Sequence, residues 1–303
     1  MYQKSVVLLV GSTGIGKTAT GIKLAKHFNC PIISADSRQI YKEMTIGTAS
    51  PTKEEQENIP HFLIATHSIT DYYNAYEFEQ DALKIAEAQF VENNIILMVG
   101  GSMMYIEAFC NGIDQLPTVD TKLREDLLEQ YNKEGIESMR SQLKLLDPNF
   151  YAQVDLKNAK RVIHAIEICL MTGKPYSVLR TNPKKERNFN IIKIGLEMNR
   201  EELYNQINKR VITMMANGLE QEARFLYKYR HLNALNTVGY KELFGYFDGT
   251  YSKEKAIELI QRNTRHYAKK QMTWFKRDKE IKWFKKDDFK EIIDFICGKK
   301  VNE

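Results

Sequence analysis

The sequence predicts an α/β fold: a P-loop NTPase-like core whose parallel sheet is flanked by helices, with an all-helical insertion domain. Short, nearly unbroken apolar runs alternate with helical patterns through the first hundred residues, as in parallel sheets covered on both faces. A glycine-rich loop joins the first apolar run to the first helical pattern. After Leu116-Pro117 the pattern becomes wholly helical until about residue 180, which indicates an insertion.

The elements of the core follow one another in a regular order. Apolar runs of strand length predict strands at 6–10, 31–34, 61–64 and 95–99. A helix is expected after the first of these strands and another at 76–91, where Phe78, Ala82 and Phe90 recur at helical spacing. The core is therefore expected to begin with a strand-helix alternation.

Turn-forming residues divide the second half of the chain. The helices of 118–180 are expected to break at Gly135, at Asp147-Pro148 and at 172–175. A further strand is expected at 191–196, and helices alone from Arg200 onward, interrupted near Gly239 and 245–249. We place the core at about 1–114 and 186–303 and the insertion at about 115–185.

The composition narrows the class of protein. Of 303 residues, 43% are hydrophobic and 27% charged, which is typical of a globular chain and not of a disordered one. The four cysteines, Cys30, Cys110, Cys169 and Cys297, form no CxxC pair, so neither a disulfide framework nor a zinc site is indicated. No apolar run approaches the roughly 20 residues of a membrane span, and no secretory signal is visible. We expect a cytoplasmic protein without membrane contact, and nothing demands more than a monomer.

A phosphate-binding loop follows the first strand. The segment Gly11-Ser12-Thr13-Gly14-Ile15-Gly16-Lys17-Thr18 fits the pattern G-x-x-x-x-G-K-[ST] and has the required strand before it and helix after it. In such a loop, backbone N–H groups converge on phosphate oxygens at the positive end of the helix. Lys17 would neutralise charge, and Thr18 could hold Mg²⁺. A glycine turn with a chance lysine is the alternative, which the context disfavours.

The usual hydrolysis machinery is not apparent. P-loop ATPases and GTPases carry a Mg²⁺-binding Asp on a neighbouring strand, but the apolar run 95–99 has no carboxylate. The acidic residue nearest a strand end is Asp36, after the run 31–34. One interpretation is that the phosphate group bound by the loop is a leaving group and is not itself transferred.

Two polar residues follow predicted strands and so face the ligand crevice of an α/β fold. Asp36 could act there as a general base, or it could simply cap a turn or a helix. Ser102, in Gly100-Gly101-Ser102, could position a substrate or belong to an ordinary turn. Spacing alone does not separate these alternatives.

The positive charge of the chain is concentrated near its end. Residues 262–286 contain ten Lys and Arg against two acidic residues, a local net of +8, whereas the whole chain carries +5. Both tryptophans, Trp274 and Trp283, are interleaved with these charges. This pattern fits a polyanion partner whose unpaired bases stack on aromatic rings. It also fits an amphipathic helix with packed aromatics and solvated charges, and we expect both descriptions to hold.

Taken together, the motifs resemble the bacterial tRNA dimethylallyltransferase family, also called tRNA isopentenyltransferase. A P-loop alone would not justify a family, but an ordered set spanning nearly the whole chain does. The set comprises GSTGIGKT (11–18), ISADSRQIYKEMTIGTASP (33–51), PHFLI (60–64), VGGSMMY (99–105), KRVIHAIE (160–167), TGKPYS (172–177), NGLEQE (217–222), VGYKEL (238–243) and AKKQMTWFKR (268–277).

The resemblance implies an activity and its partners. A dimethylallyl (isopentenyl) group would move from dimethylallyl diphosphate to N6 of the adenosine next to the anticodon, in tRNAs that read codons beginning with U. The P-loop would then hold the diphosphate of the donor with Mg²⁺. The partner would be the anticodon stem-loop, bound in part by the basic C-terminal helical region.

The resemblance also implies roles for individual residues. Asp36 matches the general base, Ser102 a substrate-contacting position that is usually Thr, and Arg210 an arginine that helps to bind diphosphate. Gly14–Thr18 match the diphosphate cradle. Contacts with tRNA are implied for Asp36, Ser37, Arg38, Gln39, Ser102, Arg124, Lys160, Arg161, Val162, Ile163 and His164. His164 stands where the family usually has Arg.

Three other functions fit part of the sequence. A P-loop nucleoside or nucleotide kinase would explain the loop and Asp36. It would not explain the basic, aromatic segment 262–286, here called the basic tail. An enzyme that prenylates free adenine nucleotides should not need the residues from Arg262 onward. A non-catalytic RNA-binding protein with a relic P-loop would bind RNA whether or not Asp36 were present.

Overall fold

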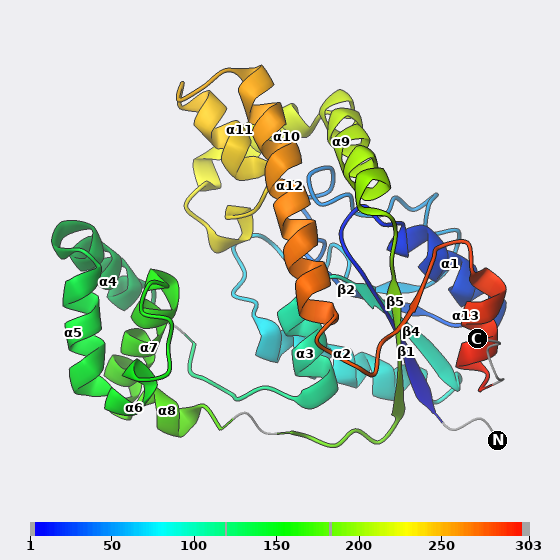
Figure 1. The fold of residues 1–303 in the computed structure, drawn as a ribbon, viewed down its shortest axis with the longest axis horizontal. Coiled ribbons are helices and arrows are strands. Elements are labelled where there is room, and N and C mark those ends of the chain that lie inside the picture. The colour runs from blue at the N-terminus through cyan, green and yellow to red at the C-terminus, as the bar shows by residue number, and fades with distance from the viewer. Residues whose placement is uncertain (1–3, 119, 182–183, 299–303) are drawn as a thin grey trace. The chain divides into compact units, whose positions relative to one another are not determined.

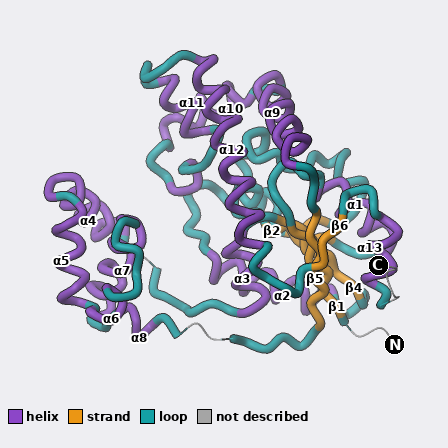
Figure 2. The backbone as a smooth tube through the Cα atoms, in the orientation of Figure 1, coloured by secondary structure: helices purple, strands orange, loops and turns teal. Residues whose placement is uncertain are grey.

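Six parallel strands form one sheet in the order β3-β2-β4-β1-β5-β6. Figure 2 shows strands in orange and helices in purple. The bounds of the strands are β1 Ser5–Val10, β2 Ile32–Ala35, β3 His61–Phe62, β4 Ile95–Gly100, β5 Asn190–Leu196 and β6 Lys282–Phe284. The computed structural model describes residues 4–118, 120–181 and 184–298, and the chain divides into two units, Asn111–Lys185 and the remainder. The predicted α/β class with a parallel, helix-flanked sheet is confirmed.

Helices cover both faces of the sheet because β1 alternates its apolar side chains between them. Val6, Leu8 and Val10 pack with helices α2 (Ala75–Gln89) and α3 (Met103–Asn111). Val7 and Leu9 pack with α1 (Lys17–Phe28), α9 (Arg200–Ala216) and α13 (Phe289–Ile296) on the opposite face (Figure 1). This two-sided burial explains why β1 reads as a continuous apolar run.

The strand β6 is a correction to the sequence analysis, which expected only helices after Arg200. Its three residues pair in parallel with Ile194–Leu196 at the edge of the sheet. Lys282 is exposed and Phe284 buried, so the segment has the charged, short character of an edge strand. A run of three residues within a basic, aromatic stretch gives no period that separates it from a helix.

Four helices gather beside the sheet around a third apolar cluster (Figure 1). They are α9, α10 (Leu219–Leu226), α11 (Tyr240–Phe247) and α12 (Lys253–Phe275), with 3-10 turns at Tyr227–Tyr229 and Asn233–Leu235. Gly239 precedes α11 as predicted, and α11 ends at Phe247, within the predicted interruption at 245–249, although Gly245 itself lies inside that helix. A Cβ at Gly245 would lie 2.3 Å from the Tyr251 hydroxyl, so this glycine serves close packing.

The unit Asn111–Lys185 is all-helical, with its own apolar core around Met139, Leu143 and Ile166. The limits of 115–185 taken from the sequence lie within it. Predicted breaks coincide with Gly135, at φ 80°, and with Asp147, which caps a short helix. Its helices are α4 Thr121–Glu134, α5 Ile136–Leu146, α6 Pro148–Tyr151, α7 Ala159–Thr172 and α8 Tyr176–Leu179. Across the described residues of the whole chain, no helix combines the length and hydropathy needed to cross a bilayer.

Candidate functional site

Three polar segments meet at one edge of the sheet because they follow three neighbouring parallel strands. The loop 11–18 follows β1, Asp36 follows β2, and Gly101-Ser102 follows β4. In open parallel sheets this carboxyl edge is where ligands bind. The fold thus brings together a phosphate loop, a carboxylate and a hydroxyl from three separate segments of the chain.

The phosphate loop has the backbone that its glycines allow. Gly14 and Gly16 have φ values of 81° and 99°, in the left-handed region that disfavours residues with a Cβ. A Cβ at Gly14 would also lie 2.9 Å from Ile207 Cγ1. Ser12 and Ile15 are buried beneath the loop, whereas Thr18 is exposed at the start of α1. The loop therefore presents backbone and the Thr18 hydroxyl outward.

Two cations lie beside this loop. Lys17 Nζ donates to the carbonyl oxygens of Gly11, at 3.1 Å, and Ser12, at 2.8 Å. Burial lowers the pKa of Lys17 to about 8, although the Asp36 carboxylate opposes this shift and Arg210 adds to it. Burial likewise lowers the pKa of Arg210, whose Nη1 donates to Thr13 Oγ1 at 3.2 Å. Both cations are largely stripped of hydration and are thus prepared to bind an anion.

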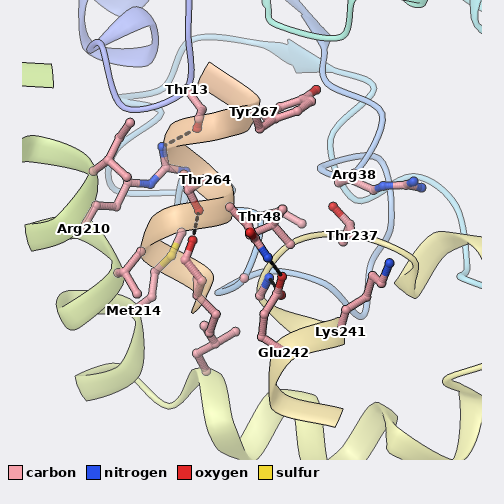
Figure 3. A pocket seen from close by; sticks show the side chains of 18 of the residues that line it. Thr13, Arg38, Thr48, Arg210, Met214, Thr237, Lys241, Glu242, Thr264 and Tyr267 are labelled. Atoms are coloured by element: carbon pink, nitrogen blue, oxygen red, sulfur yellow. Dashed lines mark hydrogen bonds between the residues drawn. The ribbon is translucent and has the colours of Figure 1, made fainter. Parts of the chain in front are cut away.

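Two cavities open from this edge and share one wall. The first, of about 550 Å³, is lined by Thr13, Gly14 and residues 16–19 of the phosphate loop and the start of α1, and by Gln39. The second, of about 480 Å³, runs between α9, α11 and α12 and ends at Thr237 and Lys241 (Figure 3). The residues that line both cavities are Thr13, Asp36, Thr48, Arg210 and Tyr267. Asp36 therefore stands where a ligand in one cavity would meet a ligand in the other.

Asp36 both stabilises a turn and lines the two cavities. Its Oδ1 accepts hydrogen bonds from the backbone N–H of Arg38, at 2.9 Å, and of Gln39, at 3.3 Å. Its Oδ2 makes no hydrogen bond within the described part of the chain. The two interpretations of Asp36 are thus compatible, because one oxygen holds the turn and the other is left for a ligand.

The remaining predicted residues of this segment divide between the cavities. Ser37 and Arg38 line the second cavity and Gln39 the first. Ser102 is 6% exposed and lines neither: its hydroxyl accepts from Ser37 N at 2.7 Å and lies 3.1 Å from Ser37 Oγ. Ser102 therefore holds the residue next to Asp36, and its hydroxyl is engaged there.

A carboxylate that the sequence analysis did not single out fixes the wall shared by the cavities. Glu222 on α10 accepts hydrogen bonds from the backbone N–H groups of Thr45, Ile46 and Gly47, at 2.8–2.9 Å. The Tyr240 hydroxyl donates to it as well, at 2.7 Å. Burial and this carboxylate raise the pKa of Tyr240. The backbone partners lie at least 175 residues away in the chain, so no local pattern could have revealed them.

We expect Glu222→Gln to destabilise the protein, because an amide nitrogen cannot accept the hydrogen bonds that one carboxylate oxygen accepts now. The expected decrease is about 2–3 kcal/mol of unfolding free energy, measured by denaturant titration. Glu220→Gln on the same helix is the control: Glu220 makes surface ion pairs with Arg224 and Lys253, and its removal should cost at most about 1 kcal/mol. Equal effects of the two substitutions would contradict the role assigned to Glu222.

Comparison with known proteins shows the family of this chain. The family model described as IPP transferase matches residues 39–278. The chain belongs to the IPP transferase family. A curated relative from Bacteroides thetaiotaomicron, tRNA dimethylallyltransferase 1, is 52% identical over 292 residues, covering 96% of this chain and 95% of its own length. A protein of the same name from Bacteroides fragilis is 52% identical over 98% of both chains.

Solved structures of the IPP transferase family share the fold. The tRNA isopentenylpyrophosphate transferase from Bacillus halodurans is 34% identical, with a TM-score of 0.72 over 98% of this chain and 96% of that one. A eukaryotic dimethylallyltransferase, described as acting on tRNA, has a TM-score of 0.76 over 99% of this chain and 81% of its own. Because this structure is only 24% identical in sequence, the match shows a shared fold and no more. These matches give the kinase alternative no support.

The helical unit of this family member holds the other residues implied by the resemblance. Arg124 forms a two-pronged ion pair with the buried Glu167, with both distances at 2.6 Å, and His164 Nδ1 lies 3.3 Å from the same carboxylate. Lys160 and Arg161 are exposed, whereas Val162 and Ile163 belong to the apolar core. Any RNA contact by side chains of 160–164 must therefore come from Lys160, Arg161 and His164.

The basic tail, residues 262–286, comprises the last part of α12 and the strand β6, and its aromatic side chains are buried to different extents. Phe275 and Phe284 are buried, and Trp274 and Trp283 are half-buried, so most of the aromatics pack. Tyr267 is exposed at the junction of the two cavities, and Lys270 lines the second cavity. Lys276 is 3.6 Å from Glu197, while Lys269 and Lys270 have no acidic partner among the described residues. Lys270 is thus a tail charge well placed for an anionic ligand in the second cavity, and Lys269 is its neighbour in the chain.

Proposed function

We propose that this protein transfers a dimethylallyl group from dimethylallyl diphosphate to N6 of an adenosine in tRNA, and releases diphosphate. The adenosine is the one adjacent, on the 3′ side, to the anticodon of tRNAs that read codons beginning with U. Relatives named tRNA dimethylallyltransferase support the reaction class. The observation that carries the proposal is the meeting of two cavities at Asp36, one built on a phosphate loop and one on a basic helix.

The cavity on the phosphate loop is assigned to the donor. The amides of Gly14 and of 16–18, together with Lys17 and Arg210, surround the place where a diphosphate would lie, so the charge that develops on the leaving group is stabilised in advance. This assignment explains why the chain has a phosphate loop but no carboxylate on β4. The phosphate group departs from the transferred carbon, and no water needs to be activated.

The cavity between α9, α11 and α12 is assigned to the adenosine, which must leave the base stack to reach Asp36. The C–O bond between the dimethylallyl carbon and the diphosphate breaks, and the N6–C bond forms. The N6 proton passes to Asp36 Oδ2, the carboxylate oxygen that has no other partner in the described chain. Tyr267, exposed at the junction, is positioned to cover the reacting groups.

A magnesium ion fits this donor site in part. The exposed Thr18 hydroxyl supplies one oxygen ligand of the kind that Mg²⁺ prefers. The described residues contain no group of three carboxylate, His or Cys side chains that could hold a metal alone. We therefore propose that Thr18 and the oxygens of the bound diphosphate share the ion, which when bound would neutralise diphosphate charge. We further propose that the protein acts as a monomer in the cytoplasm, the compartment that contains its tRNA substrate.

The decisive experiment is a mass assay on unmodified anticodon stem-loop RNA. The protein, Mg²⁺ and dimethylallyl diphosphate are mixed with a loop that carries adenosine at the target position, and with a guanosine control. The proposal expects a C₅H₈ mass gain on the adenosine loop alone. No gain on either loop, with prenylation of free adenine nucleotides instead, would overturn the tRNA assignment.

We expect removal of the charge of Lys270, which lines the second cavity, and of its neighbour Lys269 to weaken tRNA binding. The variant Lys269→Gln/Lys270→Gln should bind with lower affinity, and its salt slope should be shallower by about 0.7–0.9 for each phosphate that is no longer neutralised. The matched control is Lys84→Gln/Lys290→Gln, which removes two exposed charges on α2 and α13. Filter binding between about 50 and 300 mM salt measures both. A slope equal to wild type for the tail variant would exclude these contacts.

A further inference from the structure

Gln271 on α12 is buried and connects three parts of the site. Its side chain is 2% exposed. Its Oε1 accepts the backbone N–H of Thr13 at 2.8 Å, and its Nε2 donates to the Gly101 carbonyl at 2.8 Å. One side chain thus joins the phosphate loop, the segment after β4 and the helix that lines the second cavity.

The bond to Thr13 defines which amides of the phosphate loop remain for a ligand. A backbone N–H that donates to Gln271 is not available to phosphate, so the ligand-facing amides begin at Gly14. The same Thr13 accepts from Arg210 through its hydroxyl. Gln271 and Arg210 therefore hold the first half of the loop between them, from α12 and from α9.

The hydrogen bond to the Gly101 carbonyl connects Gln271 to the segment that holds Asp36. Gly101 precedes Ser102, whose hydroxyl holds Ser37, the neighbour of Asp36. A Cβ at Gly101 would lie 2.4 Å from Gln271 Nε2, so a larger residue at this position would displace the amide. A chain of hydrogen bonds and covalent neighbours thus runs from the phosphate loop through Gln271 to the carboxylate.

We infer that Gln271 is the positioning residue that sets the donor loop and the Asp36 segment in register with each other. The inference rests on the proposed function and deepens it, by naming the residue that aligns the two substrates. An amide is suited to this role because it donates and accepts at once without adding charge beside a diphosphate. Misplacement of reacting groups by about 1 Å costs on the order of 10²-fold in rate.

The test substitutes Gln271→Met, which keeps the length of the side chain but removes both hydrogen bonds. We expect kcat for prenyl transfer to fall about 10- to 100-fold. The affinity for inorganic diphosphate, measured by calorimetry without tRNA, should fall as well, while the affinity for tRNA should stay within about twofold of wild type. Gln271→Glu retains the acceptor for Thr13 but removes the donor to Gly101, and its added charge should weaken diphosphate binding further.

The control is Gln261→Met on the same helix. Gln261 also makes a side-chain bond to a backbone carbonyl, that of Asn208 at 3.3 Å, but lines neither cavity. Similar melting temperatures with unequal kcat would separate alignment from general stability. If wild type prenylates tRNA and Gln271→Met matches it in kcat and in diphosphate affinity, the inference is overturned while the proposed function stands. If wild type neither prenylates nor binds diphosphate, the proposed function itself fails.

Discussion

Asp36→Asn is expected to lower kcat for prenyl transfer by about 10²–10⁴-fold while leaving tRNA affinity within a factor of about two. The substitution removes the group that we propose accepts the N6 proton, and removal of a general base typically has this magnitude. Asparagine keeps the Oδ1 that accepts from Arg38 and Gln39, so the turn after β2 should persist. The experiment therefore isolates proton transfer from local structure.

The measurement is single-turnover prenylation of the stem-loop at saturating donor, with tRNA binding measured separately by anisotropy. Asp36→Ala is the companion variant, because it removes the turn acceptor as well as the base. We expect it to lower the melting temperature, which Asp36→Asn should not do. Turnover of Asp36→Asn equal to wild type would remove this carboxylate from the mechanism and favour a purely structural role in the turn.

The sequence predicted those parts of the site that follow from local patterns. The apolar runs of β1, β2 and β4 ended where polar residues began, and parallel pairing then brought Asp36 and the phosphate loop to one edge. The resemblance added Arg210, which has no local signal, and the structure places it on Thr13. Each of these residues could be found from one strand and its loop or from a motif typical of the family.

The residues that were not singled out make their contacts across long stretches of chain. Gln271 meets Thr13 across 258 residues, and Glu222 meets the Thr45 backbone across 177. In both contacts the partner is a backbone N–H group, which almost any residue type supplies. The residue types at these partner positions therefore do not reveal the contacts. The edge strand β6 was missed for a related reason: its pairing with β5 depends on where the chain returns and not on its own three residues.

Lys17→Met is expected to have opposite effects on stability and on donor binding. The buried ammonium charge destabilises the ligand-free fold, but it attracts the diphosphate. In the ligand-free protein burial lowers the pKa of Lys17 to about 8, so the charged form is costly below that pH. The folded protein binds fewer protons than the unfolded chain between pH 8 and about 10.5, and stability should rise with pH across that window. Removing the charge should therefore raise the melting temperature at about pH 7.

Activity should respond in the other direction. A bound diphosphate favours the protonated ammonium, so donor affinity in wild type should be full below about pH 8 and decline as the pH rises above it. Lys17→Met should lack this decline and should lower kcat by about 10²–10³-fold, the usual effect of removing one group that stabilises a developing anion. Calorimetry with dimethylallyl diphosphate from about pH 6.5 to 9.5, with scanning calorimetry of both proteins, measures these quantities. A variant that is less stable than wild type, or one with the same pH profile of donor affinity, would show that Lys17 supports the loop through its bonds to Gly11 and Ser12 and not through its charge.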